Sequence, residues 1–137
     1  MQKKLTCVLL IDDDDATNFM NRITIASREI TDHIEIKLNG KEAIEYLKCR
    51  QADHTCPQTM LIFLDINMPA MDGWEFLQDY KDLKISEKDK SVIVMLSTSS
   101  NPDDINRAER IPEVSEFENK PLQSEVLDRI MDKYFPG

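Results

Sequence analysis

Strand-like segments alternate with helix-like segments along the whole 137-residue chain. Apolar runs or apolar–polar alternation predict the strands, and apolar residues at every third or fourth position predict the helices. Because strands that alternate with helices usually form a parallel sheet covered on both faces, the pattern predicts an α/β fold. The five predicted strands are CVLLI (7–11), HIEIKL (33–38), TMLIFL (59–64), VIVML (92–96) and SEFEN (115–119).

Five predicted helices follow these strands. The first carries Phe19, Ile23, Ala26 and Ile30 at helical spacing, and we expect this apolar face to lie in the core. The fourth is predicted to start within 100–104, where an Asn-Pro pair precedes two acids. The other apolar positions expected in the core are Ala43, Ile44, Leu47, Trp74, Leu77, Tyr80, Leu122, Val126, Ile130 and Met131.

The charge balance limits the possible partners. The net charge is −9, from 26 acidic against 17 basic residues, which argues against nucleic-acid binding. No stretch approaches the length of a membrane span, and the apolar part of the N-terminus is short, ends at Asp12 and lacks a cleavage site. We therefore expect one cytoplasmic domain over residues 1–137, without a membrane partner. Cys7, Cys49 and Cys56 form no CxxC pair, so we expect three reduced thiols.

Polar side chains follow four of the predicted strands directly. Asp12 and Asp13 follow the first strand, Asp65 the third, Ser97 the fourth and Lys120 the fifth. Because the carboxyl ends of parallel strands meet at one edge of the sheet, we expect these groups to converge there. Three carboxylates in one cleft need a counter-charge, and oxygen ligands of this kind favour Mg²⁺.

The two acids that complete the DDDD run are expected to serve a different purpose. Asp14 and Asp15 stand at the predicted start of the first helix. There a carboxylate can accept backbone N–H bonds and complement the helix dipole. They are therefore predicted to begin the helix.

Four segments together make the chain resemble the receiver domain of two-component response regulators. They are LLIDD (9–13), LDINMPAMDG (64–73), VMLST (94–98) and FENKP (117–121). Their order, spacing and position at strand ends all fit, and they span nearly the whole chain. The resemblance implies a flavodoxin-like three-layer sandwich whose five-stranded parallel sheet has the order 2-1-3-4-5, with five helices.

The resemblance also implies a role for each site residue. Asp65 would be the phosphoacceptor, taking a phosphoryl group from a phosphohistidine. Mg²⁺ would be held by Asp12, Asp13, Asp65 and the backbone carbonyl of Asn67. Lys120 would pair with Asp65 and then with a phosphoryl oxygen. Further implied features are a hydrogen bond from Ser97 to the phosphoryl group, a rotamer change of Phe117, a cis peptide bond at Pro121 and a special backbone turn at Gly73.

The chain departs from the family pattern at a few positions. Ser97 stands where threonine is commoner, Thr98 where a small residue is usual, and Phe117 where tyrosine is often found. The loop 50–58 looks longer than usual and receives no role. These differences leave the acids and the lysine intact.

Three functions remain open on the sequence. The first is a single-domain response regulator without an output domain, phosphorylated by a histidine kinase or a histidine phosphotransfer protein. Its downstream protein would bind the face formed by the fourth helix, fifth strand and fifth helix, within 101–118 and 122–134. The second is a receiver-like module that binds partners without phosphorylation. The third is a Mg²⁺-dependent phosphohydrolase, which usually places an acid where this chain has Asn67. The first is favoured, and it would catalyse only its own phosphorylation and dephosphorylation.

Overall fold

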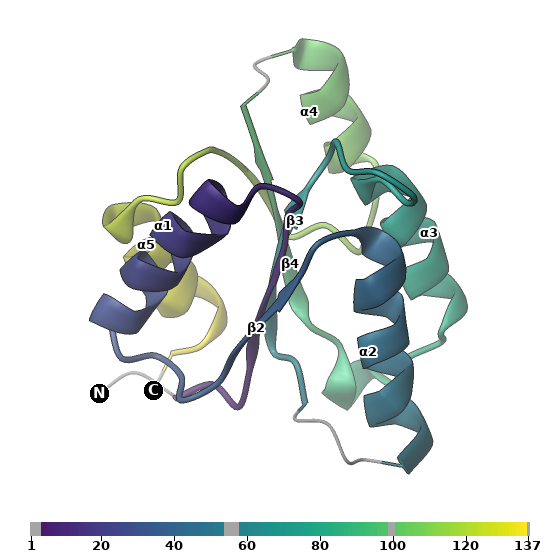
Figure 1. Ribbon diagram of the computed structural model, residues 1–137, viewed down its shortest axis with the longest axis horizontal. Coiled ribbons are helices and arrows are strands. Elements are labelled where there is room, and N and C mark those ends of the chain that lie inside the picture. Colours follow the sequence, from purple (N-terminus) through teal and green to yellow (C-terminus); the bar gives the residue numbers. More distant parts are fainter. Residues whose placement is uncertain (1–3, 54–57, 99–100, 137) are drawn as a thin grey trace.

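The computed structural model describes residues 4–53, 58–98 and 101–136. Within them, five strands form one parallel sheet in the order β2-β1-β3-β4-β5. Helices α1 and α5 cover one face, and α2, α3 and α4 lie on the other (Figure 1). The strands are β1 (Val8–Ile11), β2 (Ile34–Lys37), β3 (Leu61–Asp65), β4 (Val92–Ser97) and β5 (Glu116–Asn119). The helices are α1 (Asp15–Ser27), α2 (Gly40–Asp53), α3 (Gly73–Asp82), α4 (Pro102–Glu109) and α5 (Ser124–Tyr134), with a short 3-10 helix at Glu87–Asp89.

This architecture confirms the predicted fold and strand order. No helix in the described part of the chain is both long and apolar enough to cross a membrane. The start of α4 also matches the prediction: Asn101 precedes the helix and its side chain accepts a hydrogen bond from the Asp103 N–H at 3.0 Å. Ser100, the first residue of the predicted start, lies outside the described residues.

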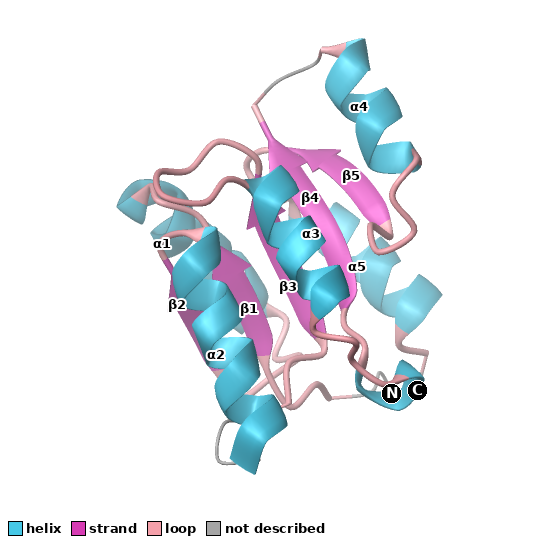
Figure 2. Ribbon diagram, turned by 90° about the vertical axis from the view of Figure 1, so that its right-hand side faces the viewer, coloured by secondary structure: helices cyan, strands magenta, loops and turns pink. Residues whose placement is uncertain are grey.

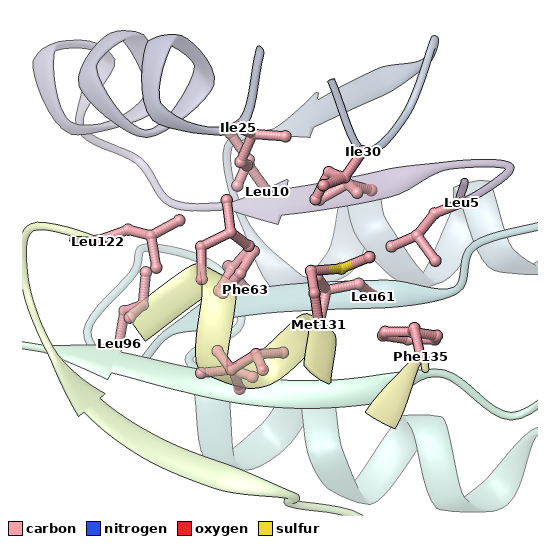
Figure 3. Packing of buried hydrophobic residues seen from close by; sticks show 14 residues of the cluster. Leu5, Leu10, Ile25, Ile30, Leu61, Phe63, Leu96, Leu122, Met131 and Phe135 are labelled. Carbon is pink, nitrogen blue, oxygen red and sulfur yellow. The ribbon is translucent and has the colours of Figure 1, made fainter. Parts of the chain in front are cut away.

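The core consists of two apolar layers, one on each face of the sheet. In the layer shown in Figure 3, Leu10, Phe63 and Leu96 of the sheet lie against Ile25 of α1 and Met131 of α5. The other layer packs alternate residues of the same strands against α2, α3 and α4. Because β1, β3 and β4 are covered on both faces, both sets of their side chains are buried, which explains their nearly unbroken apolar runs.

Helix α1 turns a different face to the sheet than the sequence predicts. Phe19 and Ile23, expected in the core, are 66% and 54% exposed. The buried positions are instead Asn18, Asn21 and Ile25. The prediction was wrong because helical spacing locates an apolar stripe on a helix but does not show which face packs against the sheet. Here two polar side chains face the sheet and hydrogen-bond specific backbone groups.

Two further expectations about single residues are corrected. Cys49 is held in a disulfide, so the three cysteines are not all reduced in this structure. Cys7 is a buried free thiol whose pKa is raised by burial, and Cys56 lies outside the described residues. Trp74 is half-buried rather than fully in the core: it packs against the layer that contains α3 and α4, and the guanidinium of Arg107 lies over its ring, 4.4 Å from the centroid.

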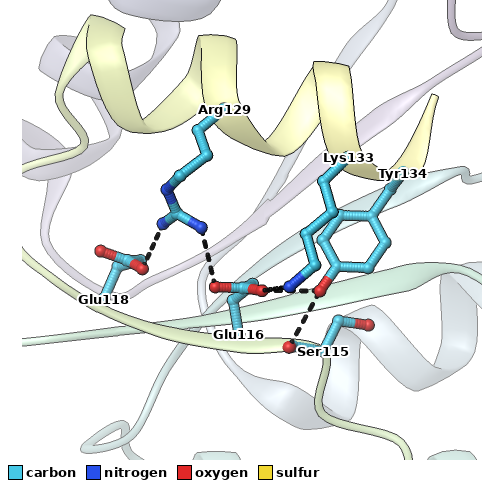
Figure 4. Close-up of polar contacts among 6 residues, drawn as sticks. All are labelled: Ser115, Glu116, Glu118, Arg129, Lys133 and Tyr134. Atoms are coloured by element: carbon cyan, nitrogen blue, oxygen red, sulfur yellow. Dashed lines mark hydrogen bonds and ion pairs between the residues drawn. The ribbon is translucent and has the colours of Figure 1, made fainter. Parts of the chain in front are cut away.

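Edge strand β5 is fastened to α5 by a polar network centred on Glu116 (Figure 4). The Glu116 carboxylate accepts hydrogen bonds from Arg129 at 3.0 Å, Lys133 at 2.8 Å and Tyr134 at 2.6 Å. Arg129 also donates to Glu118. Partial burial acts to raise the pKa of Glu116, but these bonds outweigh it and lower the pKa to about 2. The network therefore holds one side of β5 rigidly in place.

Glu116→Gln is expected to lower stability in a pH-dependent way. The folded-state pKa of about 2 lies below the ordinary value of 4.5, so the ionised carboxylate stabilises the fold above pH 4.5. That contribution is lost as the pH falls from 4.5 to about 2. At pH 7 the variant should lose about 1 to 2 kcal/mol, because water screens the half-exposed Arg129 and Lys133.

Urea unfolding of wild type and Glu116→Gln between pH 2 and pH 7 measures this difference. Glu45→Gln, at an exposed position of α2, is the matched control and should shift stability little. A Glu116→Gln difference that stays constant across the whole pH range would contradict the assigned role of the ionised carboxylate.

Candidate functional site

Three carboxylates meet at the carboxyl edge of the sheet. Strands β1 and β3 pair with Ile11 opposite Leu64, so Asp12 and Asp65, the next residue of each, lie side by side. One carboxylate oxygen from each of Asp12, Asp13 and Asp65 lies within 4.8 Å of the others. Asp12 and Asp65 are buried, whereas Asp13 is exposed at the rim. Clustered carboxylate oxygens open to solvent on one side suit a hard divalent cation such as Mg²⁺.

Lys120 supplies a positive charge to this cluster. Its Nζ lies 2.6 Å from Oδ2 of Asp12 and 2.9 Å from Oδ1 of Asp65, and its side chain is only 11% exposed. The residue directly follows β5, and its backbone N–H donates to the carbonyl of Ser97 at 2.9 Å. The Lys120–Pro121 peptide bond is cis, as the resemblance implied. One lysine therefore bridges the acid that follows β1 and the acid that ends β3.

Burial and charge act against each other in this cluster. Burial raises the pKa of Asp65, the neighbouring charge of Asp12 adds to the rise, and Lys120 opposes it. Burial acts to lower the pKa of Lys120, but hydrogen bonds to Asp12 and Asp65 outweigh it and raise the pKa. The lysine is thus held in its charged form beside Asp65, and any further positive charge would stabilise the ionised form of that carboxylate.

The first turn of α1 is organised by Asp12 as well as by the acids that follow it. Asp14 is the residue before the helix and Asp15 begins it, as predicted. However, the Asp14 side chain makes no capping bond to the backbone and instead accepts from the hydroxyl of Thr17 at 2.5 Å, which lowers its pKa. The Asp12 carboxylate accepts the Asp14 N–H at 2.9 Å. One oxygen of Asp12 therefore orders the loop while the other faces Lys120.

Gly73, the first residue of α3, is required for close approach and not for a special turn. Its φ is not positive, which corrects the prediction. Its N–H donates to the carbonyl of Ile66 at 2.8 Å, and a Cβ there would lie 2.5 Å from the carbonyl oxygen of Asp65. A side chain would have to push α3 away from the backbone of Asp65.

Gly73→Ala is expected to destabilise the domain by about 1 to 3 kcal/mol, because the contact is with rigid backbone. Gly40→Ala, at the first position of α2, is the matched control. Its Cβ would lie 2.8 Å from Cγ of Met71, a side-chain atom that can move away, and 3.0 Å from the Met71 carbonyl oxygen, a wider backbone contact than the 2.5 Å at Gly73. The control should therefore lose less than half as much in urea unfolding. Equal losses for the two variants would show that the backbone contact at Asp65 is not the cause.

Ser97, Asn67 and Phe117 lie around the cluster. Ser97 is buried at the end of β4, one residue past Leu96, which pairs with Asp65. Asn67 is exposed in the loop after β3. Phe117 is half-buried in β5 and packs on the layer that contains α3 and α4. Ser97 therefore ends the strand beside Asp65, while the roles of Asn67 and Phe117 stay predictions.

A family model described as the response regulator receiver domain matches residues 8–132. The chain belongs to this family. A solved two-component response regulator from Cytophaga hutchinsonii is 35% identical to this receiver domain, with a TM-score of 0.85 over 96% of this chain and 97% of that one. The probable methanogenesis regulatory protein FilR2 of Methanothrix harundinacea is 30% identical, over 92% of this chain and 79% of that protein. A chain of the CheX-CheY-BeF3-Mg+2 complex from Borrelia burgdorferi is 25% identical, with a TM-score of 0.75 over 93% and 88% of the two chains.

The receiver domain contains two polar residues that the sequence analysis missed. Asn18 and Asn21 of α1 are buried just behind the site, and their amides bond the backbones of Asp12 and Leu122. The available signal was their spacing of three residues, which places both on one helix face with Ile25. Their significance depends on which backbone groups they meet, and this is visible only in the folded chain.

Proposed function

We propose that this receiver domain is a phosphorylation-gated interaction module in which Asp65 accepts a phosphoryl group from a phosphohistidine. The observation that carries the proposal is Lys120, bridging buried Asp12 and Asp65 beside Asp13 at the open edge of the sheet. Phosphoryl transfer depends on positioning and charge neutralisation, and this arrangement offers a carboxylate nucleophile with both. The BeF3 and Mg+2 named for the related Borrelia burgdorferi complex agree with the same chemistry.

The proposed transfer assigns one task to each side chain. Asp12, Asp13, Asp65 and the backbone carbonyl of Asn67 would hold Mg²⁺, which supplies positive charge to the phosphoryl oxygens. A carboxylate oxygen of Asp65 attacks phosphorus while the P–N bond breaks and its electron pair returns to the donor imidazole. Lys120 then pairs with a phosphoryl oxygen, and the Ser97 hydroxyl donates to another. The chemistry acts on the domain itself, so we propose no separate enzymatic substrate.

Helix α4 is the element best suited to respond to the new charge. Ala108 is its only buried residue, whereas α3 buries four of its residues. Figure 2 shows α4 projecting at the end of the molecule where β4 ends. A phosphoryl group adds about −1.5 to −2 charges, and we propose that this charge draws in Ser97, moves Phe117 and shifts α4. Few buried contacts make such a shift inexpensive in free energy.

The proposed output surface lies beside α4, within 101–118 and 122–134. A groove of about 270 Å³ lies between α4 and β5. Its lining is mixed: Ile105, Ala108, Val114 and Phe117 are apolar, and Glu109, Ser115 and Glu116 are polar. The Glu116 network fixes the α5 side of β5, so the α4 side is the part free to change. We propose that an as yet unknown downstream protein binds here, and no nucleic acid or membrane is invoked.

The proposed phosphodonor surface is the outer face of α1. Phe19, Met20 and Ile23 are all more than half exposed, and they lie in the first three turns of α1, the helix that follows Asp12 and Asp13. An exposed apolar patch beside a reaction site fits a protein that must dock while its reactive group reaches Asp65. We assign this face to a histidine kinase or a histidine phosphotransfer protein. We also place the domain in the cytoplasm with that donor.

Intact-mass measurement after incubation with a small phosphodonor tests the proposal. One phosphoryl adduct should form with Mg²⁺ present and disappear with a chelator. Emission from Trp74, the only tryptophan, should change with the adduct because Arg107 of α4 lies over its ring. A folded protein that binds Mg²⁺ but forms no adduct would favour a phosphorylation-independent binding module.

A further inference from the structure

The buried face of α1 contains two asparagines that packing alone does not explain. Asn18 and Asn21 are 3% and 2% exposed. Burying an amide is unfavourable unless hydrogen bonds replace its contacts with water. Nδ2 of Asn18 donates to the backbone carbonyl of Asp12 at 2.8 Å, and Oδ1 of Asn21 accepts from the backbone N–H of Leu122 at 3.2 Å.

Both bonds end on the loops that carry the site. Asp12 lies in the loop between β1 and α1, and Leu122 comes two residues after Lys120 in the loop between β5 and α5. The side chains of Asp12 and Lys120 are joined by the 2.6 Å ion pair. A closed circuit therefore runs from Asn18 through the Asp12–Lys120 pair to Leu122 and back to Asn21, three residues further along the same helix.

We propose that Asn18 and Asn21 are positioning residues that hold Asp12 and Lys120 at the separation needed for phosphoryl transfer to Asp65. The inference rests on the proposed phosphorylation of Asp65. Asn18 fixes the acid through its carbonyl, and Asn21 fixes the start of the segment that follows the lysine. Both belong to the helix whose outer face is assigned to the phosphodonor, so the donor docks on the same element that sets the site geometry.

One amide donates its hydrogen bond and the other accepts, so substitutions can distinguish a role of these bonds in positioning the site from a role in packing alone. Asn18 uses its donor, and its buried Oδ1 has no hydrogen-bond partner among the described residues. Asn21 uses its acceptor. Aspartate has the same shape as asparagine but can only accept when ionised. Asn18→Asp therefore loses the bond and sets a carboxylate against a carbonyl, whereas Asn21→Asp keeps the bond to Leu122.

The test compares Asn18→Asp and Asn21→Asp, with Asn18→Leu and Asn21→Leu as variants that cannot bond at all. Phosphorylation rates from a small phosphodonor are corrected for the folded fraction. We expect Asn18→Asp and both leucine variants to fall about tenfold, the value of one hydrogen bond, and Asn21→Asp to stay within about threefold of wild type. Equal effects of aspartate at the two positions, or wild-type rates in the leucine variants, would overturn the proposal.

Two readouts do not depend on phosphorylation. Hydrogen exchange of the Leu122 amide, followed by NMR, should accelerate in Asn21→Leu and remain slow in Asn21→Asp. The Mg²⁺ dissociation constant should rise about tenfold in Asn18→Leu, because Asp12 is displaced, and stay within about threefold in Asn21→Asp. If the wild type accepts no phosphoryl group, the proposed function fails. The hydrogen-exchange rates and Mg²⁺ dissociation constants then still decide whether the asparagines position the site. Wild-type values of both in all variants would refute the positioning role.

Discussion

Asp65→Asn is expected to abolish the phosphoryl adduct while the domain stays folded. An amide is not a nucleophile toward phosphorus, so the rate of adduct formation should fall by at least about 10³-fold. Asparagine has the shape of aspartate and can still accept a hydrogen bond from Lys120, so the fold should tolerate it. Burial, which raises the pKa of Asp65, reduces the cost of losing the negative charge. Mg²⁺ binding should weaken, since one of the three carboxylates is lost.

Intact mass and urea unfolding, each with and without Mg²⁺, measure these effects. Asp82→Asn, at the exposed end of α3, is the control and should form the adduct at the wild-type rate. An adduct that persists in Asp65→Asn would place the acceptor elsewhere. Peptide mapping would then show whether Asp12 or Asp13 accepts the phosphoryl group instead.

Lys120→Met is expected to have the largest effect on stability. Among the described residues, Lys120 is the only positively charged one that forms ion pairs with both Asp12 and Asp65. The substitution removes it and leaves two buried carboxylates side by side. Breaking a buried pair in this way costs about 3 kcal/mol. Mg²⁺ should restore more stability to the variant than to wild type, because the cation replaces the lost positive charge. The phosphoryl group should still attach, but without changing Trp74 emission or partner affinity.

Lys90→Met provides the comparison, because Lys90 forms an ion pair with Glu87 at an exposed position. Its loss should lower stability far less than the loss of Lys120 and should not depend on Mg²⁺, because water screens an exposed ion pair. A Lys120→Met domain as stable as wild type without Mg²⁺ would show that the buried bridge contributes nothing. A phosphorylated variant that switches like wild type would show that the lysine does not couple phosphorylation to α4.

The sequence alone was sufficient for most of the fold and for the centre of the site. Five apolar or alternating runs identified the strands, and the residues after β1, β3 and β5 identified the acids and the lysine. These inferences succeeded because parallel strands end at the same edge of the sheet, so the residue after each strand lies at that edge whatever the details of packing. The family resemblance supplied the strand order and the cis bond at Pro121, and both are present.

Three features were visible only in the folded chain: which face of α1 packs against the sheet, the disulfide of Cys49 and the close backbone contact at Gly73. Apolar spacing favoured Phe19 and Ile23 as core, but the helix turns Asn18 and Asn21 inward. The decisive partner of Asn21 is the Leu122 N–H, 101 residues away, and no local pattern encodes that distance. Likewise, Gly73 is needed because α3 approaches the backbone of Asp65, not because of its own torsion angles. The chain thus determined by itself which groups reach the site, whereas tertiary packing decided which helix face and which backbone bonds hold them there, because long-range hydrogen bonds and close contacts exist only after distant segments meet.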